Sequence, residues 1–383
     1  MSDIKNLKKA SDRIKLAIKN KERIIIYGDA DLDGTTSVII LKETIKNLGA
    51  KEPVIYFPNR ETDGYGINEN ALNFLEKYAP ALLISLDLGI GNVKEVKAAK
   101  KMGFKVIIID HHEILDEIPK ADIVVDPKQK GDRSFKGFAN VGIVFKLAQI
   151  LLGGSMTENL RKNFLELTAL ATIADMMPRE EENEIFITEG LRYMEDTWRP
   201  GLKAFFEISH FENYPNLSQK ISKIISVLNA RDIENQKPAS FRLLTNYSLE
   251  ECKDMVRRLL EKSERRREKI QQVSDEIKKK ISSTQAPIIF EGDKSLDYSF
   301  ISPIASILCN EFKKPTFIYK KSETESQGAV RAPRGINSVT LMKSCKKLLV
   351  SFGGHPMASG FRIKNENLEK FKTCLIKNLN PKP

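Results

Sequence analysis

The sequence predicts an α/β protein of two domains, in which a parallel-sheet domain is joined by a long helix to a smaller α/β domain. Three observations lead to this fold class. Short β-branched runs alternate with amphipathic stretches over the first 130 residues, a pattern typical of a parallel sheet covered by helices. Residues 249–281 contain neither Gly nor Pro. A second α/β pattern follows, and 383 residues exceed the roughly 250–300 at which single cores stop growing.

Five apolar runs in the N-terminal part predict buried parallel strands. They lie at residues 23–27, 53–57, 81–86, 105–109 and 122–125. Amphipathic stretches predict helices at 35–48, 68–78 and 92–102, and helical patterns dominate from 141 to 260. Ligands of parallel sheets bind at the carboxyl ends of the strands, so the residues directly after each strand are candidates for a site.

The rest of the chain reads as one long connecting helix followed by the second domain. Its apolar spacing and lack of breakers predict a single helix at 249–281. Strands are predicted near 287–290, 316–319 and 329–331. Gly353 and Gly354 predict a tight turn.

Composition indicates a cytoplasmic protein without membrane association. The hydrophobic fraction of 41% is ordinary for a globular protein. No apolar run reaches the ~18–20 residues that span a bilayer, and the first 21 residues are polar and Lys-rich, unlike a secretory signal. Four widely spaced cysteines without a CxxC pair predict free structural thiols in a reducing compartment. They are Cys252, Cys309, Cys345 and Cys374.

Positive charge is concentrated near the C-terminus. The formal net charge is +11, and residues 331–383 contain eleven Lys or Arg against two acids, Glu366 and Glu369. Such a segment suits a polyanion-binding surface. A solvated Lys-rich surface explains the composition equally well.

An acidic motif follows the first predicted strand: Gly28-Asp29-Ala30-Asp31-Leu32-Asp33-Gly34. Three carboxylates at alternating positions on the end of a buried strand repel one another, and without a cation their pKa values rise. The motif therefore indicates a cation site. The alternative is an Asp-rich turn in which Asp33 caps a helix beginning near Thr35.

Acids and imidazoles also follow the later strands. Asp87 comes after the third strand, Asp110, His111 and His112 after the fourth, and Asp175 lies at the end of a helical apolar stretch. Three strand ends are therefore expected to carry acids or imidazoles at the same edge of one parallel sheet. Carboxylate and imidazole without sulfur favour manganese or magnesium. Their number suggests two ions about 3.5–4 Å apart that activate a water for attack on phosphorus.

Together these motifs resemble the DHH phosphoesterase family, and within it the RecJ-like branch. The matching stretches are GDADLDG at 28–34, SLDLGI at 85–90, IDHHE at 109–113, VDP at 125–127 and ATIADMMP at 171–178. PNRETDGYGIN at 58–68, VGIVFKLA at 141–148 and LNAR at 228–231 add support, and SFGGHPMASGF at 351–361 looks like the signature of a DHH-associated domain. The resemblance implies a DHH catalytic domain at 1–240, a connecting helix at 241–285 and a DHH-associated substrate-binding domain at 286–383.

The resemblance also implies a role for each site residue. Many DHH enzymes have a His where this chain has Tyr27, and RecJ-like enzymes use an Asp at the position of Asp29 instead. This difference counts against the nano-RNase and pyrophosphatase branches. Asp110 is expected to orient an imidazole, and His112 to contact the scissile phosphate and protonate the leaving oxygen. The implied metal ligands are Asp29, Asp31, Asp33, Asp87, His111 and Asp175.

Residues of the second domain are implied to hold the substrate. His355, with Gly353 and Gly354 before it, would bind phosphate, since glycines let backbone N–H groups approach an anion closely. The alternative is a glycine turn with an exposed His. Arg331 and Arg334 flank a Gly/Pro-rich loop, although Ala332-Pro333 departs from the Ser-rich context of RecJ-like chains. His210 matches no motif and is interpreted as structural.

The implied activity is a 5′ to 3′ exonuclease acting on single-stranded nucleic acid, with DNA favoured over RNA, and with Mn²⁺ preferred over Mg²⁺. One alternative is a phosphodiesterase for short oligonucleotides or RNA, as in nano-RNases. Another is a non-catalytic replication scaffold, which the intact ligand set disfavours. Little sequence follows Phe361, so the OB-type domain of long bacterial RecJ proteins is expected to be absent. The sequence carries no signal of oligomeric state.

Overall fold

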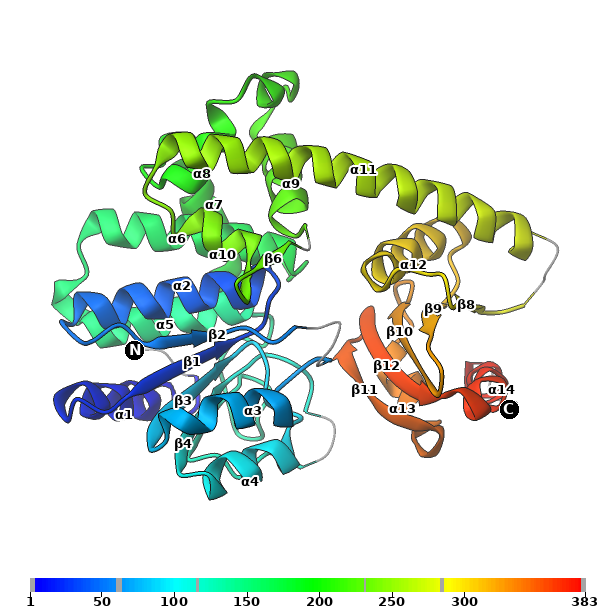
Figure 1. The fold of residues 1–383 in the computed structure, drawn as a ribbon, viewed down its shortest axis with the longest axis horizontal. Coiled ribbons are helices and arrows are strands. Elements are labelled where there is room, and N and C mark those ends of the chain that lie inside the picture. Colours follow the sequence, from blue (N-terminus) through cyan, green and yellow to red (C-terminus); the bar gives the residue numbers. More distant parts are fainter. Residues whose placement is uncertain (1–3, 60–63, 115–116, 231, 283–285, 380–383) are drawn as a thin grey trace. The chain divides into compact units, whose positions relative to one another are not determined.

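The computed structural model describes residues 4–59, 64–114, 117–230, 232–282 and 286–379. The chain divides into two compact units, Met1–Ser263 and Glu264–Pro383. Both are α/β structures (Figure 1), as predicted. The boundary between the units falls inside the predicted long helix, which is continuous as α11, Leu249–Ile281.

The first unit contains a five-stranded parallel sheet in the order β2-β1-β3-β4-β5. Every neighbouring pair is parallel, which confirms the expected sheet. Apolar residues dominate its central strands because both faces of the sheet are buried. The strands are β1 (Ile24–Gly28), β2 (Val54–Tyr56), β3 (Ala81–Leu86), β4 (Phe104–Ile109) and β5 (Ile123–Val125).

Alternate residues of each strand supply two hydrophobic layers, one on each face of the sheet. Ile26 packs with helices α1, α2 and α5 on one face, and Ile25 packs with α3 and α4 on the other. Figure 1 shows α3 and α4 together on one side of the strands and α2 and α5 together on the other. These helices are α1 (Leu7–Lys19), α2 (Leu32–Asn47), α3 (Glu69–Leu75), α4 (Val93–Lys101) and α5 (Asn140–Leu152).

Helices then extend the α2–α5 layer. The hydrophobic core of that layer continues into α6 through α10 and into the first half of α11, so the predicted helical region belongs to the first unit. A short antiparallel hairpin pairs β6 (Ile233–Glu234) with β7 (Lys237–Pro238). The helices are α6 (Glu158–Ala174), α7 (Glu181–Arg192), α8 (Pro200–Phe206), α9 (Leu217–Leu228) and α10 (Ala239–Leu244).

The second unit is built on a mixed sheet in the order β11-β12-β10-β9-β8. Only β8 and β9 are parallel neighbours within it. Phe317 faces a core shared with α13 and α14, and Ile318 faces α12 and the end of α11. The elements are β8 (Ile289–Asp293), α12 (Tyr298–Phe312), β9 (Thr316–Lys321), β10 (Glu325–Arg331), α13 (Ser338–Lys343), β11 (Leu349–His355), β12 (Ala358–Lys364) and α14 (Leu368–Leu379).

The tight turn predicted at Gly353 and Gly354 is wrong. Both glycines lie inside β11, and the turn falls at Pro356 and Met357, between β11 and β12. Gly354 has φ +126°, and a Cβ there would lie 2.7 Å from the backbone oxygen of Ala358. The glycine therefore permits a close approach of paired strands rather than a reversal of the chain.

The prediction that all four cysteines are free is wrong for two of them. Cys345 and Cys374 form a disulfide with their Cα atoms 6.1 Å apart, while Cys252 and Cys309 are free and buried. Packing of α13 against α14 brings the pair together across 29 residues of sequence. Within the described part of the chain, no helix has the length and apolar character needed to cross a membrane.

Candidate metal centre

The acidic motif after β1 forms the turn into α2. The helix begins at Leu32, and Asp31, not Asp33, is its N-cap, with a carboxylate that accepts from the Gly34 N–H at 3.0 Å. A Cβ on Gly34 would lie 2.5 Å from the backbone oxygen of Asp29. Only glycine lets the turn close this tightly, and the closure holds Asp29 and Asp31 at the end of the strand.

Asp33 is fixed by the N-terminus of α5. Its two carboxylate oxygens accept from the backbone N–H groups of Asn140 at 2.7 Å and Val141 at 2.8 Å. Burial, with further contributions from Asp175 and Asp31, raises the pKa of Asp33 well above its usual value, against the lowering effect of these two bonds. A rigidly held, buried carboxylate among like charges is an arrangement that a cation stabilises.

Asp87 follows β3 in a backbone conformation that is uncommon outside glycine. Its φ is +64°, and its N–H donates to the Ile109 carbonyl of the neighbouring strand at 3.0 Å. Burial and then the charges of Asp33, Asp31, Asp29 and Asp175 raise the pKa of Asp87 well above its usual value. Backbone strain of this kind is frequent where a side chain must be aimed into a functional site.

The protonation state of His111 follows from its contacts. Nδ1 lies 2.8 Å from the Phe138 carbonyl oxygen, which can only accept, so Nδ1 carries the hydrogen and Nε2 of the neutral ring presents a lone pair. Burial, with the neighbouring His112 charge, lowers the pKa of His111 to about 3. At neutral pH the imidazole is therefore uncharged and can act as a metal ligand.

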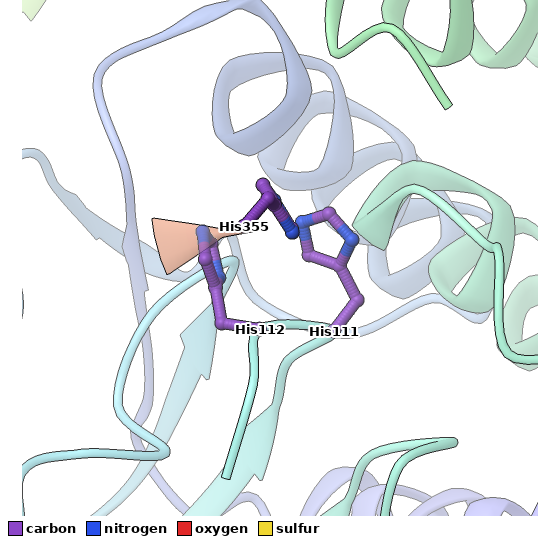
Figure 2. A group of neighbouring side chains, drawn as sticks. All are labelled: His111, His112 and His355. Carbon is purple, nitrogen blue, oxygen red and sulfur yellow. The ribbon is translucent and has the colours of Figure 1, made fainter. Parts of the chain in front are cut away.

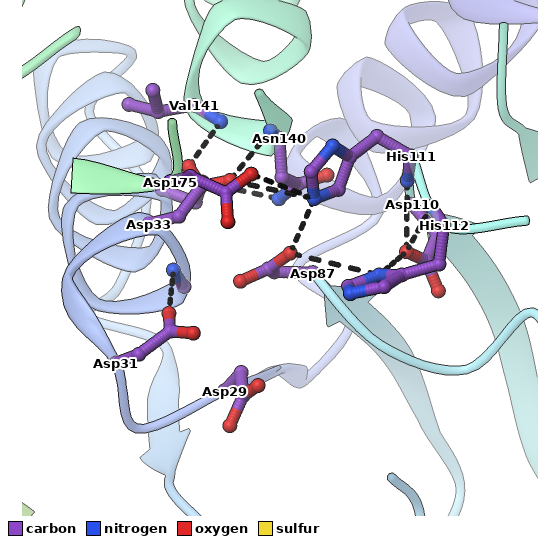
Figure 3. A network of polar contacts seen from close by, with 12 residues as sticks. Asp29, Asp31, Asp33, Asp87, Asp110, His111, His112, Asn140, Val141 and Asp175 are labelled. Carbon is purple, nitrogen blue, oxygen red and sulfur yellow. Dashed lines mark hydrogen bonds and ion pairs between the residues drawn. The ribbon is translucent and has the colours of Figure 1, made fainter. Parts of the chain in front are cut away.

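Three carboxylates surround this lone pair (Figure 3). Nε2 of His111 lies 3.1 Å from Asp87 Oδ1 and 3.6 Å from an oxygen each of Asp33 and Asp175. Four electron-rich atoms therefore converge in a buried place, and the neutral ring offers the carboxylates no hydrogen at Nε2. Such a donor set repels itself unless a cation lies among its members, and the residues fit a divalent metal of the manganese or magnesium type.

The donor atoms form two overlapping groups. Ligand atoms of Asp33, Asp87 and His111 lie within 4.8 Å of one another, and those of Asp29, Asp31 and Asp87 do so as well. Asp87 belongs to both groups. The structure thus brings all six sequence-predicted ligands to one edge of the sheet, with Asp175 arriving from the end of α6.

Asp110 and His112 form a hydrogen-bonded pair beside these groups. His112 Nδ1 lies 2.8 Å from Asp110 Oδ1, and Asp110 also accepts from the N–H groups of Ile90 and His111. Burial alone would lower the pKa of His112, but the charge and hydrogen bond of Asp110 raise it to about 9. His112 is therefore a cation at neutral pH, whereas His111, which projects from the same turn (Figure 2), is neutral.

Tyr65 is a site residue that the sequence reasoning missed. Its hydroxyl donates to the Asp87 carbonyl oxygen at 2.9 Å and lies 3.1 Å from His112 Nδ1. The residue belongs to the stretch 58–68, of which residues 60–63 lie outside the described part. The signal that could have identified it is an aromatic hydroxyl between two glycines, Gly64 and Gly66, ahead of the Asn68 cap of α3.

The five predicted substrate-binding residues belong to the second unit. Gly353, Gly354 and His355 form the end of β11. Arg331 ends β10, and its guanidinium donates to Ser306 Oγ at 3.0 Å and to Ser302, both on α12. Arg334 lies in the loop before α13 and is exposed.

Comparisons with known proteins agree with this architecture. Residues 23–172 match the model of the DHH family, N-terminal domain, and residues 276–380 match the model of the DHHA1 domain. The chain belongs to the DHH family.

Its relatives include single-stranded-DNA-specific exonucleases named RecJ. The Bacillus subtilis protein is 33% identical over 382 residues, which cover 97% of this chain and 48% of that protein. The Escherichia coli protein is 24% identical, with 96% of this chain and 68% of that protein covered. This chain therefore spans about half the length of the Bacillus subtilis relative.

Solved structures share the fold. A crystal structure of exonuclease RecJ bound to manganese has a TM-score of 0.79 at 24% identity and covers 99% of this chain and 96% of that chain. RecJ from Thermus thermophilus, in complex with Mn²⁺, has a TM-score of 0.83 at 23% identity and covers 99% of this chain and 55% of that chain. At these identities the similarity concerns the fold.

Proposed function

We propose that this protein is a metal-dependent phosphodiesterase that removes nucleotides from an end of single-stranded DNA, with the 5′ to 3′ polarity of a RecJ-like exonuclease. One observation carries the proposal: the unprotonated Nε2 of His111 lies within 3.1–3.6 Å of carboxylate oxygens of Asp33, Asp87 and Asp175. A donor set of this kind at the carboxyl ends of parallel strands suits phosphoester hydrolysis. The named activity of the curated relatives supports the same assignment.

Two divalent ions, manganese in preference to magnesium, are assigned to the site. Asp33, His111 and Asp175 would hold one, Asp29 and Asp31 the other, and Asp87 would serve both, because it is common to the two groups of donors. Ions in such a site lower the pKa of a water and offset charge on phosphate oxygens. The chain itself supplies the fixed geometry, through the α5 N–H groups that hold Asp33 and the Phe138 carbonyl that sets the tautomer of His111.

His112 is assigned as the group that meets the scissile phosphate and protonates the leaving oxygen. It is cationic at neutral pH, it is partly exposed, and Asp110 holds its Nδ1. A positioned acid of this kind contributes about 10²–10⁴-fold to the rate of hydrolysis. Asp110 is assigned the role of orienting the His112 imidazole, since its oxygens already accept hydrogen bonds from Ile90, His111 and His112.

The second unit is assigned to binding of the strand. His355 with Gly353 and Gly354, and Arg331 and Arg334, would contact phosphate. The positive charge of residues 331–383 would add non-specific attraction. Affinity that depends on phosphate contacts falls as salt rises.

The experiment uses single-stranded DNA and RNA of equal sequence, labelled at either terminus, with Mn²⁺ or with Mg²⁺. The proposal expects faster digestion of DNA, mononucleotide release from the 5′ end, and no product with Asp87→Asn under the same conditions. Intact oligonucleotides with both metals would contradict the hydrolase assignment. If the protein cleaved dinucleotides efficiently but left long strands intact, the exonuclease assignment would give way to that of a short-oligonucleotide phosphodiesterase.

A further inference from the structure

Tyr65 reaches the site from a segment distant in sequence. Its hydroxyl oxygen lies 2.9 Å from the Asp87 carbonyl oxygen, 3.1 Å from His112 Nδ1 and 3.3 Å from His112 Nε2. Its ring meets the His112 ring edge-on, with centroids 5.4 Å apart and planes at 62°. The same side chain therefore contacts the backbone of one site residue and the imidazole of another.

The hydrogen-bond capacity of the hydroxyl determines what it does there. A tyrosine hydroxyl has one hydrogen and can also accept. A carbonyl oxygen only accepts, so the hydrogen goes to Asp87, and the oxygen presents its lone pairs to the His112 ring. Asp110 holds the ring at Nδ1. A further contact from Tyr65, near both ring nitrogens, restricts tilting of the imidazole about that bond.

We propose that Tyr65 is a positioning residue that fixes the orientation of the His112 imidazole for transfer of a proton to the leaving oxygen. The inference rests on the proposed phosphodiester hydrolysis. In that reaction a water oxygen bonds to phosphorus and the bond from phosphorus to the leaving sugar oxygen breaks. The N–H bond of His112 breaks and its proton goes to that oxygen, and the proton lost by the water returns to His112 through solvent.

A positioning role makes a specific prediction about leaving groups. A sugar oxygen departs as a poor leaving group and needs the proton, whereas p-nitrophenolate departs without one. The variant Tyr65→Phe keeps the ring contact and removes the hydroxyl. We expect it to lower kcat on a single-stranded oligonucleotide about 10-fold, a part of the 10²–10⁴-fold that a general acid contributes, with KM changed less than about 2-fold.

The test compares that oligonucleotide with the p-nitrophenyl ester of thymidine 5′-monophosphate, both with Mn²⁺. Tyr65→Phe should cleave the ester at the wild-type rate. Calorimetric titration with Mn²⁺ should give the wild-type affinity, a readout independent of turnover. Tyr247→Phe is the matched control, because Tyr247 is 80% exposed and lies outside the site, and it should behave as wild type in every assay.

Three results would overturn the inference. Equal losses on both substrates would mean that Tyr65 does not act through leaving-group protonation. Lower Mn²⁺ affinity in Tyr65→Phe would mean that the hydroxyl acts through Asp87. Full activity of the variant on both substrates would show that the Tyr65 hydroxyl has no role in hydrolysis. Wild-type protein that hydrolyses neither substrate would instead refute the proposed function, and this inference with it.

Discussion

Replacing Asp87 by Asn should stabilise the protein without metal and destabilise it relative to wild type with metal. In the absence of cations, Asp87 lies among Asp29, Asp31, Asp33 and Asp175, and burial and these charges together raise its pKa. Two full charges within 4.8 Å of one another repel by at least about 3 kcal/mol at an effective dielectric constant of about 20. Solvent screening and relaxation of the neighbouring side chains relieve part of this repulsion, and we expect a gain of about 1–2 kcal/mol.

The assay is thermal unfolding in EDTA and in Mn²⁺. A gain of about 1–2 kcal/mol raises Tm by about 2–8 °C for a domain of this size, so Asp87→Asn should melt above wild type in EDTA. Manganese at about 100 times its Kd should raise the free energy of unfolding of wild type by about 2.7 kcal/mol. It should raise that of the variant by much less. The order of the two melting temperatures therefore reverses when the metal is added. The control Asp196→Asn changes an exposed residue outside the site and should follow wild type in both conditions.

A variant that melts below wild type in EDTA would refute the reasoning, because the carboxylate would then be stabilised by protein contacts rather than strained by its neighbours. An equal manganese response of the variant and wild type would separately exclude Asp87 as a ligand. In that case the ions would have to be held by residues outside the two donor groups to which Asp87 belongs.

Four further predictions test other parts of the structure. His111→Ala should abolish cleavage with a preserved circular dichroism spectrum; retained turnover would exclude His111 from the metal site. His355→Ala should raise KM while the Mn²⁺ affinity measured by calorimetry stays at its wild-type value; weaker manganese binding would contradict a role in substrate contact. Replacing the exposed Lys346 and Lys347 by Ala should reduce the slope of log affinity against log salt by about 1.4, since each phosphate contact on a single strand accounts for about 0.7; an unchanged slope would place the strand elsewhere. Burial raises the pKa of Glu166 to about 7, against the opposing effects of Thr197 and Arg199. The unfolded chain therefore loses this proton first, and the stability contribution present below about pH 4.5 declines until about pH 7. Glu166→Gln should cancel this decline, worth about 3 kcal/mol, in urea unfolding followed from about pH 4.5 to 8, and a parallel pH profile of the two proteins would contradict it.

The metal-site residues could be predicted because simple rules act on them directly. Buried β-branched runs identify parallel strands, and parallel strands end at one edge of a sheet. Asp33, Asp87 and His111 follow such strands within a few residues, so their meeting follows from topology alone. Asp175 needs one further step, since it ends α6 rather than a strand.

Other features depend on contacts that no local pattern contains. The strands β11 and β12 were missed because Gly353, Gly354 and Gly360 lower strand propensity, and pairing with β10 overrides that preference. The Phe138 carbonyl that sets the His111 tautomer is a backbone group 27 residues away. Tyr65 lies 47 residues before His112, in a stretch that belongs to the family resemblance but that no local rule connects to the site.

The pairing of Cys345 with Cys374 also depends on tertiary structure. The spacing of 29 residues matches no motif, and only the packing of α13 on α14 brings the two Cα atoms to 6.1 Å. The same packing contributes to the core of the second unit. Cysteine spacing alone therefore predicted free thiols at two positions where the fold creates a bridge.

Anomalous diffraction at the manganese edge, from crystals of the protein grown with Mn²⁺, tests the central claim most directly. We predict two anomalous peaks, one among Asp33, Asp87, His111 and Asp175 and one among Asp29, Asp31 and Asp87. The absence of an anomalous peak within ligand distance of Asp87 and His111, in crystals that show manganese elsewhere or none at all, would contradict the assignment of these residues to a metal centre.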